Sequence, residues 1–96
     1  MTNETKPLTQ TDALKQMLAE AEDGMSFSIK TLEIELASIR NYADQALQAV
    51  KDGQRLPGGF DLLEHARRAD VADAERLREA REMKLIEYHL NKIKEQ

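Results

Sequence analysis

Residues 53–60 read GQRLPGGF and divide the chain into two parts. Pro57 has no backbone N–H to donate, and the Gly58–Gly59 pair after it is a strong turn signal, so a helix cannot continue through this stretch. On both sides of it, apolar residues recur every three or four positions, which is helical spacing. The sequence therefore predicts an all-α chain of two long helices joined by one loop.

The first predicted helix covers residues 9–52. Thr9 is a suitable N-cap with Asp12 three positions later, and the polar residues 1–8 are expected to form a disordered tail before a single helical domain at 9–96. Gly24 is the weak point, because glycine costs about 1 kcal/mol inside a helix. A helix ending there would place acidic residues in its last turn, against the dipole, so we favour one continuous helix over two hinged at Gly24. The apolar positions are Leu14, Leu18, Ala21, Met25, Ile29, Leu32, Leu36, Ile39, Ala43, Ala46 and Val50.

The second predicted helix covers residues 61–94. Asp61 is its expected N-cap, and Glu64 completes a pattern that resembles a capping box. Its apolar stripe is rich in alanine in the middle, which allows close helix approach but buries little area. The stripe consists of Leu62, Leu63, Ala66, Ala69, Ala72, Leu77, Ala80, Met83, Ile86, Leu90 and Ile93.

Charge patterning favours an antiparallel hairpin. When Asp52 is placed near Asp61 across the loop, nearly every facing position carries an opposite charge; the clearest pairs are Asp44–Arg68, Arg40–Asp73 and Glu35–Arg78. Each exposed pair contributes only about 0–1 kcal/mol, so the pattern specifies orientation more than stability. In this register residues 9–17 extend past the end of the second helix.

The apolar stripes are wider than a lone hairpin can cover. Contiguous exposed apolar surface usually marks an interface, so we expect the chain to form a homodimeric four-helix bundle. The alternative is that the first helix folds back at Gly24. The residues expected in the core or at the dimer interface are Leu14, Leu18, Met25, Leu32, Leu36, Ile39, Ile86 and Leu90.

Composition excludes several classes of protein. The 96 residues include 14 Lys and Arg against 18 Asp and Glu, a net charge of −4, which argues against a nucleic-acid binder. Without cysteine there are no disulfides and no thiolate metal sites. No apolar run approaches 18 residues, and residues 1–10 lack the apolar region of a secretory signal, so we expect a cytoplasmic chain with no membrane span.

Catalytic and metal-binding signals are absent from the sequence. It contains none of the common nucleophile, metalloprotease or phosphate-loop motifs, and two helices alone do not enclose a pocket for acid–base chemistry. Asp61 and His65 have the spacing of a chelating pair, but two ligands do not make a site. We therefore expect no enzyme activity, no cofactor and no metal, and we interpret His65 as an ordinary surface histidine.

A group of arginines is the strongest candidate for a binding site, because guanidinium groups bind carboxylates and phosphates well. The candidates are Arg55, Arg67, Arg68, Arg76 and Arg78. Neighbouring glutamates could neutralise them on the helix surface, and we favour that interpretation for most of them. Arg67 and Arg68 lie near the loop, where acidic partners are fewest. With Arg55, they are expected to form the most electropositive end, where an acidic partner would dock.

Two functional hypotheses follow from this architecture. The first is a non-enzymatic protein that binds another protein as an adaptor, inhibitor or regulator, a design common among small accessory proteins of phages, plasmids and secretion systems. The second is a helical oligomer that sequesters a nucleotide or another small anion through the arginines. The first is favoured, because the arginines have acidic neighbours at helical spacing.

Overall fold

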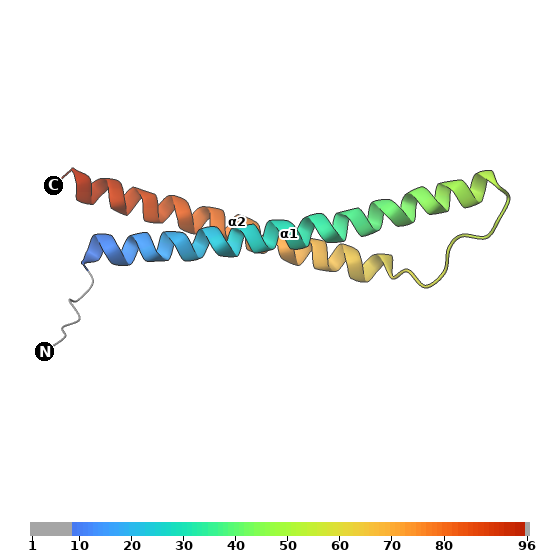
Figure 1. Ribbon diagram of the computed structural model, residues 1–96, viewed down its shortest axis with the longest axis horizontal. Helices are drawn as coiled ribbons and strands as arrows, with labels where there is room; N and C mark the ends of the chain where they lie inside the picture. The colour runs from blue at the N-terminus through green and yellow to red at the C-terminus, as the bar shows by residue number, and fades with distance from the viewer. Residues whose placement is uncertain (1–8, 96) are drawn as a thin grey trace, which may run out of the picture.

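The computed structural model describes residues 9–95, which form two antiparallel helices. Helix α1 spans Gln10–Lys51 and helix α2 spans Leu62–Lys94 (Figure 1). The predicted all-α hairpin with its reversal near residues 53–60 is confirmed. The predicted disordered tail at residues 1–8 lies outside the described residues. In the part of the chain that is described, neither helix is long and apolar enough to cross a membrane.

Both helices begin and end where the sequence predicts, because their caps satisfy backbone groups that the helix leaves unpaired. The side chain of Thr9 accepts a hydrogen bond from the Asp12 N–H at 3.1 Å, and the Asp61 carboxylate accepts one from the Glu64 N–H at 3.0 Å. At the end of α1, Gly53 takes a φ of 68°, which glycine adopts without strain. This conformation lets the Gln54 N–H donate to the Ala49 carbonyl at 2.8 Å, the bond of a Schellman motif.

The helices meet along a line of residues at heptad spacing, which we call the seam. The buried residues of α1 are Ala21, Ser28, Glu35 and Ala49, all separated by multiples of seven. The complete α1 seam is half-buried or buried and consists of Leu14, Leu18, Ala21, Met25, Ser28, Leu32, Glu35, Ile39, Tyr42, Ala46 and Ala49. On α2 it consists of His65, Ala69, Ala72, Arg76, Glu79, Met83, Ile86, Leu90 and Ile93.

In the second half of the α1 stripe, Leu32, Ile39 and Ala46 lie on the seam as predicted, but the alternate members were predicted wrongly. We expected the apolar residues Ile29, Leu36 and Val50 to face α2, but Leu36 is 52% exposed and Val50 is 65% exposed. The structure places the preceding residues of each turn, such as Ser28 and Glu35, on the seam instead. An unbroken 3.5-residue period keeps one side of a helix facing its partner, whereas the predicted stutter would rotate it away.

On α2, the same heptad spacing leaves two leucines that we predicted in the core outside the seam. Leu63 is 83% exposed and Leu77 is 44% exposed, while His65 and Arg76 lie on the seam. The apolar part of the seam is small. The buried apolar residues are Ala21, Ala49, Ala69, Ala72 and Ile86, so Ile86 is the one large apolar side chain buried within residues 9–95.

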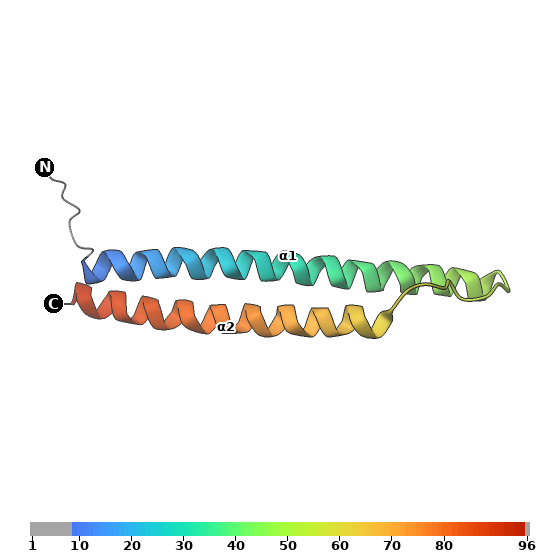
Figure 2. The ribbon, with the colours of Figure 1, turned by 90° about the horizontal axis from the view of Figure 1, so that it is seen from below.

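The register of the hairpin also differs from the prediction. The predicted pairing would place His65 opposite Gln48, whereas the structure places it against Glu35. The reason is the loop, which does not reverse tightly but runs back along the last turns of α1 (Figure 2). Its Phe60 stacks on Tyr42, with ring centroids 4.7 Å apart. Helix α2 therefore begins about three turns before α1 ends.

The shifted register also changes which part of α1 lies beside α2 at the N-terminal end of α1. We predicted that residues 9–17 would extend past α2, but they lie beside its C-terminal turns (Figure 2). Thr11, Lys15 and Leu18 share a cleft of about 540 Å³ with residues of α2. Its α2 residues are Glu87, Leu90, Asn91, Ile93 and Lys94. The part of α1 without a helical partner is its C-terminal end.

Helix α1 is continuous through Gly24, as predicted. A Cβ atom at this position would lie 3.1 Å from Oε1 of Glu79, so glycine permits the close approach of α2. That neighbour is the flexible end of a side chain and can move by a few tenths of an ångström.

We therefore expect Gly24→Ala to stabilise the protein by about 0.5–1 kcal/mol, because alanine removes the conformational entropy that glycine loses in a helix. Urea unfolding at fixed protein concentration measures the change. Loss of stability instead would mean that the Glu79 carboxylate is held rigidly in place.

Candidate partner-binding site

The four candidate arginines of α2 pair with carboxylates of their own helix. Arg76 binds Asp73 and Arg78 binds Glu75, each three positions apart. The interhelical pairs Asp44–Arg68, Arg40–Asp73 and Glu35–Arg78 predicted from the sequence are therefore wrong, and the register explains why. The structure instead shows the other predicted arrangement, in which each arginine is neutralised by an acidic residue one turn away on the same helix.

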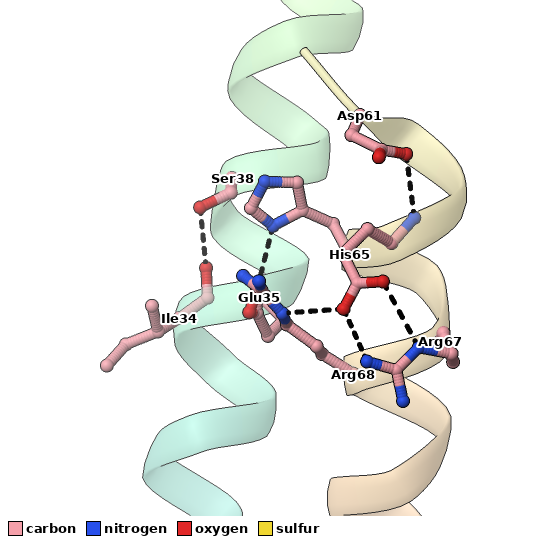
Figure 3. Close-up of polar contacts among 8 residues, drawn as sticks. Ile34, Glu35, Ser38, Asp61, His65, Arg67 and Arg68 are labelled. Atoms are coloured by element: carbon pink, nitrogen blue, oxygen red, sulfur yellow. Dashed lines mark hydrogen bonds and ion pairs between the residues drawn. The ribbon is translucent and has the colours of Figure 1, made fainter.

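Arg67 and Arg68 share a single acidic partner. Both guanidinium groups bind the Glu64 carboxylate, with Arg68 Nε donating to Oε2 at 3.0 Å (Figure 3). The hydrogen bond from Arg67 lowers the pKa of Glu64 below its usual value, and Arg68 adds to this effect. One carboxylate thus balances two guanidinium groups. These three side chains together therefore keep one net positive charge.

The lowered pKa of Glu64 determines how its contribution to folding stability changes with pH. A carboxyl whose pKa falls on folding stabilises the fold above its unfolded-state pKa, and the contribution disappears as pH falls through the folded-state pKa. Because these groups are exposed, solvent screens the interaction and the contribution of Glu64 to stability is small. The arginine pair is therefore available for recognition without a large cost to the fold.

The arginine pair borders a groove between the two helices, which we call the arginine-rimmed groove. The groove has a volume of about 460 Å³ and is lined by Phe27, Ser28 and Thr31 of α1 and by Arg67, Arg68, Val71, Ala72 and Glu75 of α2. Phe27 is 72% exposed and Val71 is 51% exposed, so the walls present apolar surface to solvent. An apolar groove with cationic groups at its edge can hold an apolar side chain and an adjacent carboxylate.

Arg55 does not belong to this site. The loop places Gln54 against Ala49, whereas the groove places Arg68 near Thr31. Eighteen residues of helix separate these two levels, or about 27 Å along the axis. The predicted electropositive cluster of Arg55 with Arg67 and Arg68 is therefore wrong, because the loop extends away from α2 instead of turning tightly beside it.

A buried polar cluster lies next to the groove, on the seam. Glu35 is 7% exposed, and its Oε1 contacts Nδ1 of His65 at 2.7 Å (Figure 3). The two groups therefore satisfy each other's hydrogen bonding inside the hairpin. The His65 ring also stacks on Phe60 with centroids 4.5 Å apart, and Phe60 stacks in turn on Tyr42. The interpretation of His65 as an ordinary surface histidine was therefore wrong.

Sequence reasoning missed this cluster although one signal was present. Glu35 lies two heptads after Ala21, on the same line of the helix, so a strict heptad reading would have placed it on the seam. Asp61, which lies four positions before His65, caps α2. Within residues 9–95 no three histidine, cysteine, aspartate or glutamate side chains are grouped as metal ligands.

The predicted core and interface residues occupy three environments. Ile86 is buried and Leu36 is exposed, while the others are half-buried along the seam. The half-buried members are Leu14, Leu18, Met25, Leu32, Ile39 and Leu90. The single chain therefore covers most of the predicted set only in part.

Comparison with protein-family models, with curated proteins and with solved structures gives no match for this chain.

Proposed function

We propose that this chain is a non-enzymatic homodimeric protein that binds an acidic segment of another protein in the arginine-rimmed groove. In this role it would act as an adaptor, inhibitor or regulator of its partner. The cytoplasmic location stays a prediction from the sequence.

One observation carries this proposal: the hairpin exposes more large apolar side chains than it buries. Ile86 is the one such side chain buried in the described residues, whereas thirteen are at least 44% exposed. Exposed apolar surface arranged along rigid helices is typical of proteins that bind other macromolecules. A chain with this distribution gains stability from what it binds.

The chemistry of the groove favours an acidic protein segment. Phe27 and Val71 offer an apolar contact, and Arg67 and Arg68 share one carboxylate beside it. A partner carboxylate placed there would give each guanidinium an anion of its own. Arginine and aromatic side chains are also the residue types that most often dominate binding energy at protein interfaces.

A nucleotide-binding function receives less support. Four of the five candidate arginines already bind local carboxylates, and Arg55 lies at a different level of the hairpin. The groove is long and apolar rather than a convergent ring of cations. These features suit a protein segment better than a compact anion.

A position-specific cross-linking experiment tests the proposal. A photo-cross-linking amino acid at position 71 should form an adduct with another protein in the cells that produce this chain. The same group at position 77, on the opposite face, should not form that adduct. Arg68→Glu should abolish the adduct at position 71, because a partner carboxylate would meet a like charge.

Two controls separate binding from folding. Arg68→Glu should change the free energy of unfolding by less than about 1 kcal/mol, because exposed ion pairs contribute little. Arg78→Glu, which alters a locally paired arginine outside the groove lining, should leave the adduct intact. An adduct that persists in Arg68→Glu, or tight binding of ATP in a calorimetric titration, would overturn the proposal.

A further inference from the structure

The faces of the hairpin are defined by their position relative to the seam. Phe27 and Val71 each precede a seam residue by one position, and both line the groove. Residues that follow a seam position by one must therefore lie on the opposite face, because one step turns a helix by about 100°. This applies to Leu36, Leu47 and Val50 of α1 and to Leu77 of α2. Leu63 lies two heptads before Leu77 and continues the same line, and we call these five residues the outer stripe.

The outer stripe is exposed in the single chain. Its members range from 44% exposed for Leu77 to 83% exposed for Leu63. The seam, by contrast, contains Ser28, Glu35 and His65. The seam is mainly apolar but also holds these polar side chains, while several leucines face outward. Exposed apolar side chains gathered on one face usually mark a surface that binds another molecule.

The stripe has the dimensions of a dimer interface. From the level of Leu77 to Val50 it covers about 27 residues of helix, or roughly 40 Å. Both helices, together about 20 Å wide, are present over roughly the first 22 Å, and α1 continues alone beyond the start of α2. That face offers roughly 600 Å², the lower end of the area that a standard-size complex buries on each partner. A second copy supplies the same surface, so one self-complementary contact covers both stripes.

We infer that a second copy of this chain covers the outer stripe, which leaves the arginine-rimmed groove of each copy open on the opposite face. This inference rests on the homodimer of the proposed function and assigns its interface. The dimer would carry two partner sites facing away from each other, so one dimer could bridge two copies of the partner.

Sedimentation equilibrium of the full chain tests the inference with matched variants. The wild-type chain should be a dimer at micromolar concentration. Leu36→Asp and Leu63→Asp should each weaken the dimer about 100-fold or more, because each buries an unpaired charge in the interface. The matched control Phe27→Asp changes a side chain of greater exposure than Leu36 on the groove face, and should shift the dissociation constant by less than about threefold.

Two aspartate variants are used so that loss of the dimer can be distinguished from unfolding of the chain. Leu63 is 83% exposed, so Leu63→Asp should keep the helical circular dichroism of the hairpin even if Leu36→Asp does not. A wild-type monomer at micromolar concentration would overturn the homodimer itself. A wild-type dimer that Phe27→Asp dissociates, while both stripe variants leave it intact, would keep the homodimer and overturn the interface assigned here.

Discussion

Replacing His65 with leucine should destabilise the hairpin by about 3 kcal/mol, because it leaves the Glu35 carboxylate buried without a partner. Glu35 is 7% exposed, and its Oε1 lies 2.7 Å from Nδ1 of His65. Removing one member of a buried hydrogen-bonded pair costs more than the pair contributes, since the remaining buried polar group has lost its partner. Denaturant unfolding at fixed protein concentration measures the loss.

The double variant Glu35→Leu/His65→Leu should recover most of that stability. Two leucines remove both polar partners, and replacing a buried polar pair with packed apolar residues is often neutral or stabilising. The double-mutant cycle should therefore give a coupling energy of about 2–3 kcal/mol. Coupling near zero would show that solvent compensates Glu35 when the imidazole is absent.

Specificity of register explains why a polar pair sits on the seam. The centre of α2 contributes Ala69 and Ala72 to the seam, and small side chains permit many sliding registers. A single Glu35–His65 contact is satisfied at one register only, as a buried polar residue fixes alignment in coiled coils. The double leucine variant should therefore be stable but less uniform, with broader amide resonances around residues 60–70 in an NMR spectrum.

Local signals predicted the helices well. Thr9, Asp61 and the Pro57–Gly58–Gly59 break each act on neighbouring backbone groups, and all three behave as the sequence predicts. The continuity of α1 through Gly24 was also predicted correctly, because the acidic residues before it would have opposed a helix end there. Caps and breaks depend on a few adjacent residues, so a single sequence contains the information that they need.

Register could not be predicted, because it depends on the path of the loop. Charge matching favoured a tight reversal, yet Phe60 stacks between Tyr42 and His65 and holds the loop along α1. The favoured register relied on exposed ion pairs worth about 0–1 kcal/mol each, too weak to outweigh an aromatic stack and a buried ion pair. The arginine-rimmed groove was missed in part for the same reason, since Phe27 and Val71 meet only in the true register.

The second large effect concerns the C-terminal half of the seam. Ile86→Ala should destabilise the protein by about 2–4 kcal/mol, because it removes the one large buried apolar side chain described in residues 9–95. Ile86 is 2% exposed, so the lost methyl and methylene groups leave a cavity that two rigid helices cannot close fully.

Leu85 provides the matched control for Ile86, since it is the adjacent residue, has a side chain of the same size and is 58% exposed. Leu85→Ala should change the free energy of unfolding by about 0.5 kcal/mol or less. Hydrogen exchange adds a local readout: Ile86→Ala should reduce amide protection in the C-terminal half of α2 and in the first turns of α1, which lie beside it. Equal losses from the two alanine variants would mean that Leu85 is covered in the assembled protein, and that the groove face contributes to the dimer as well.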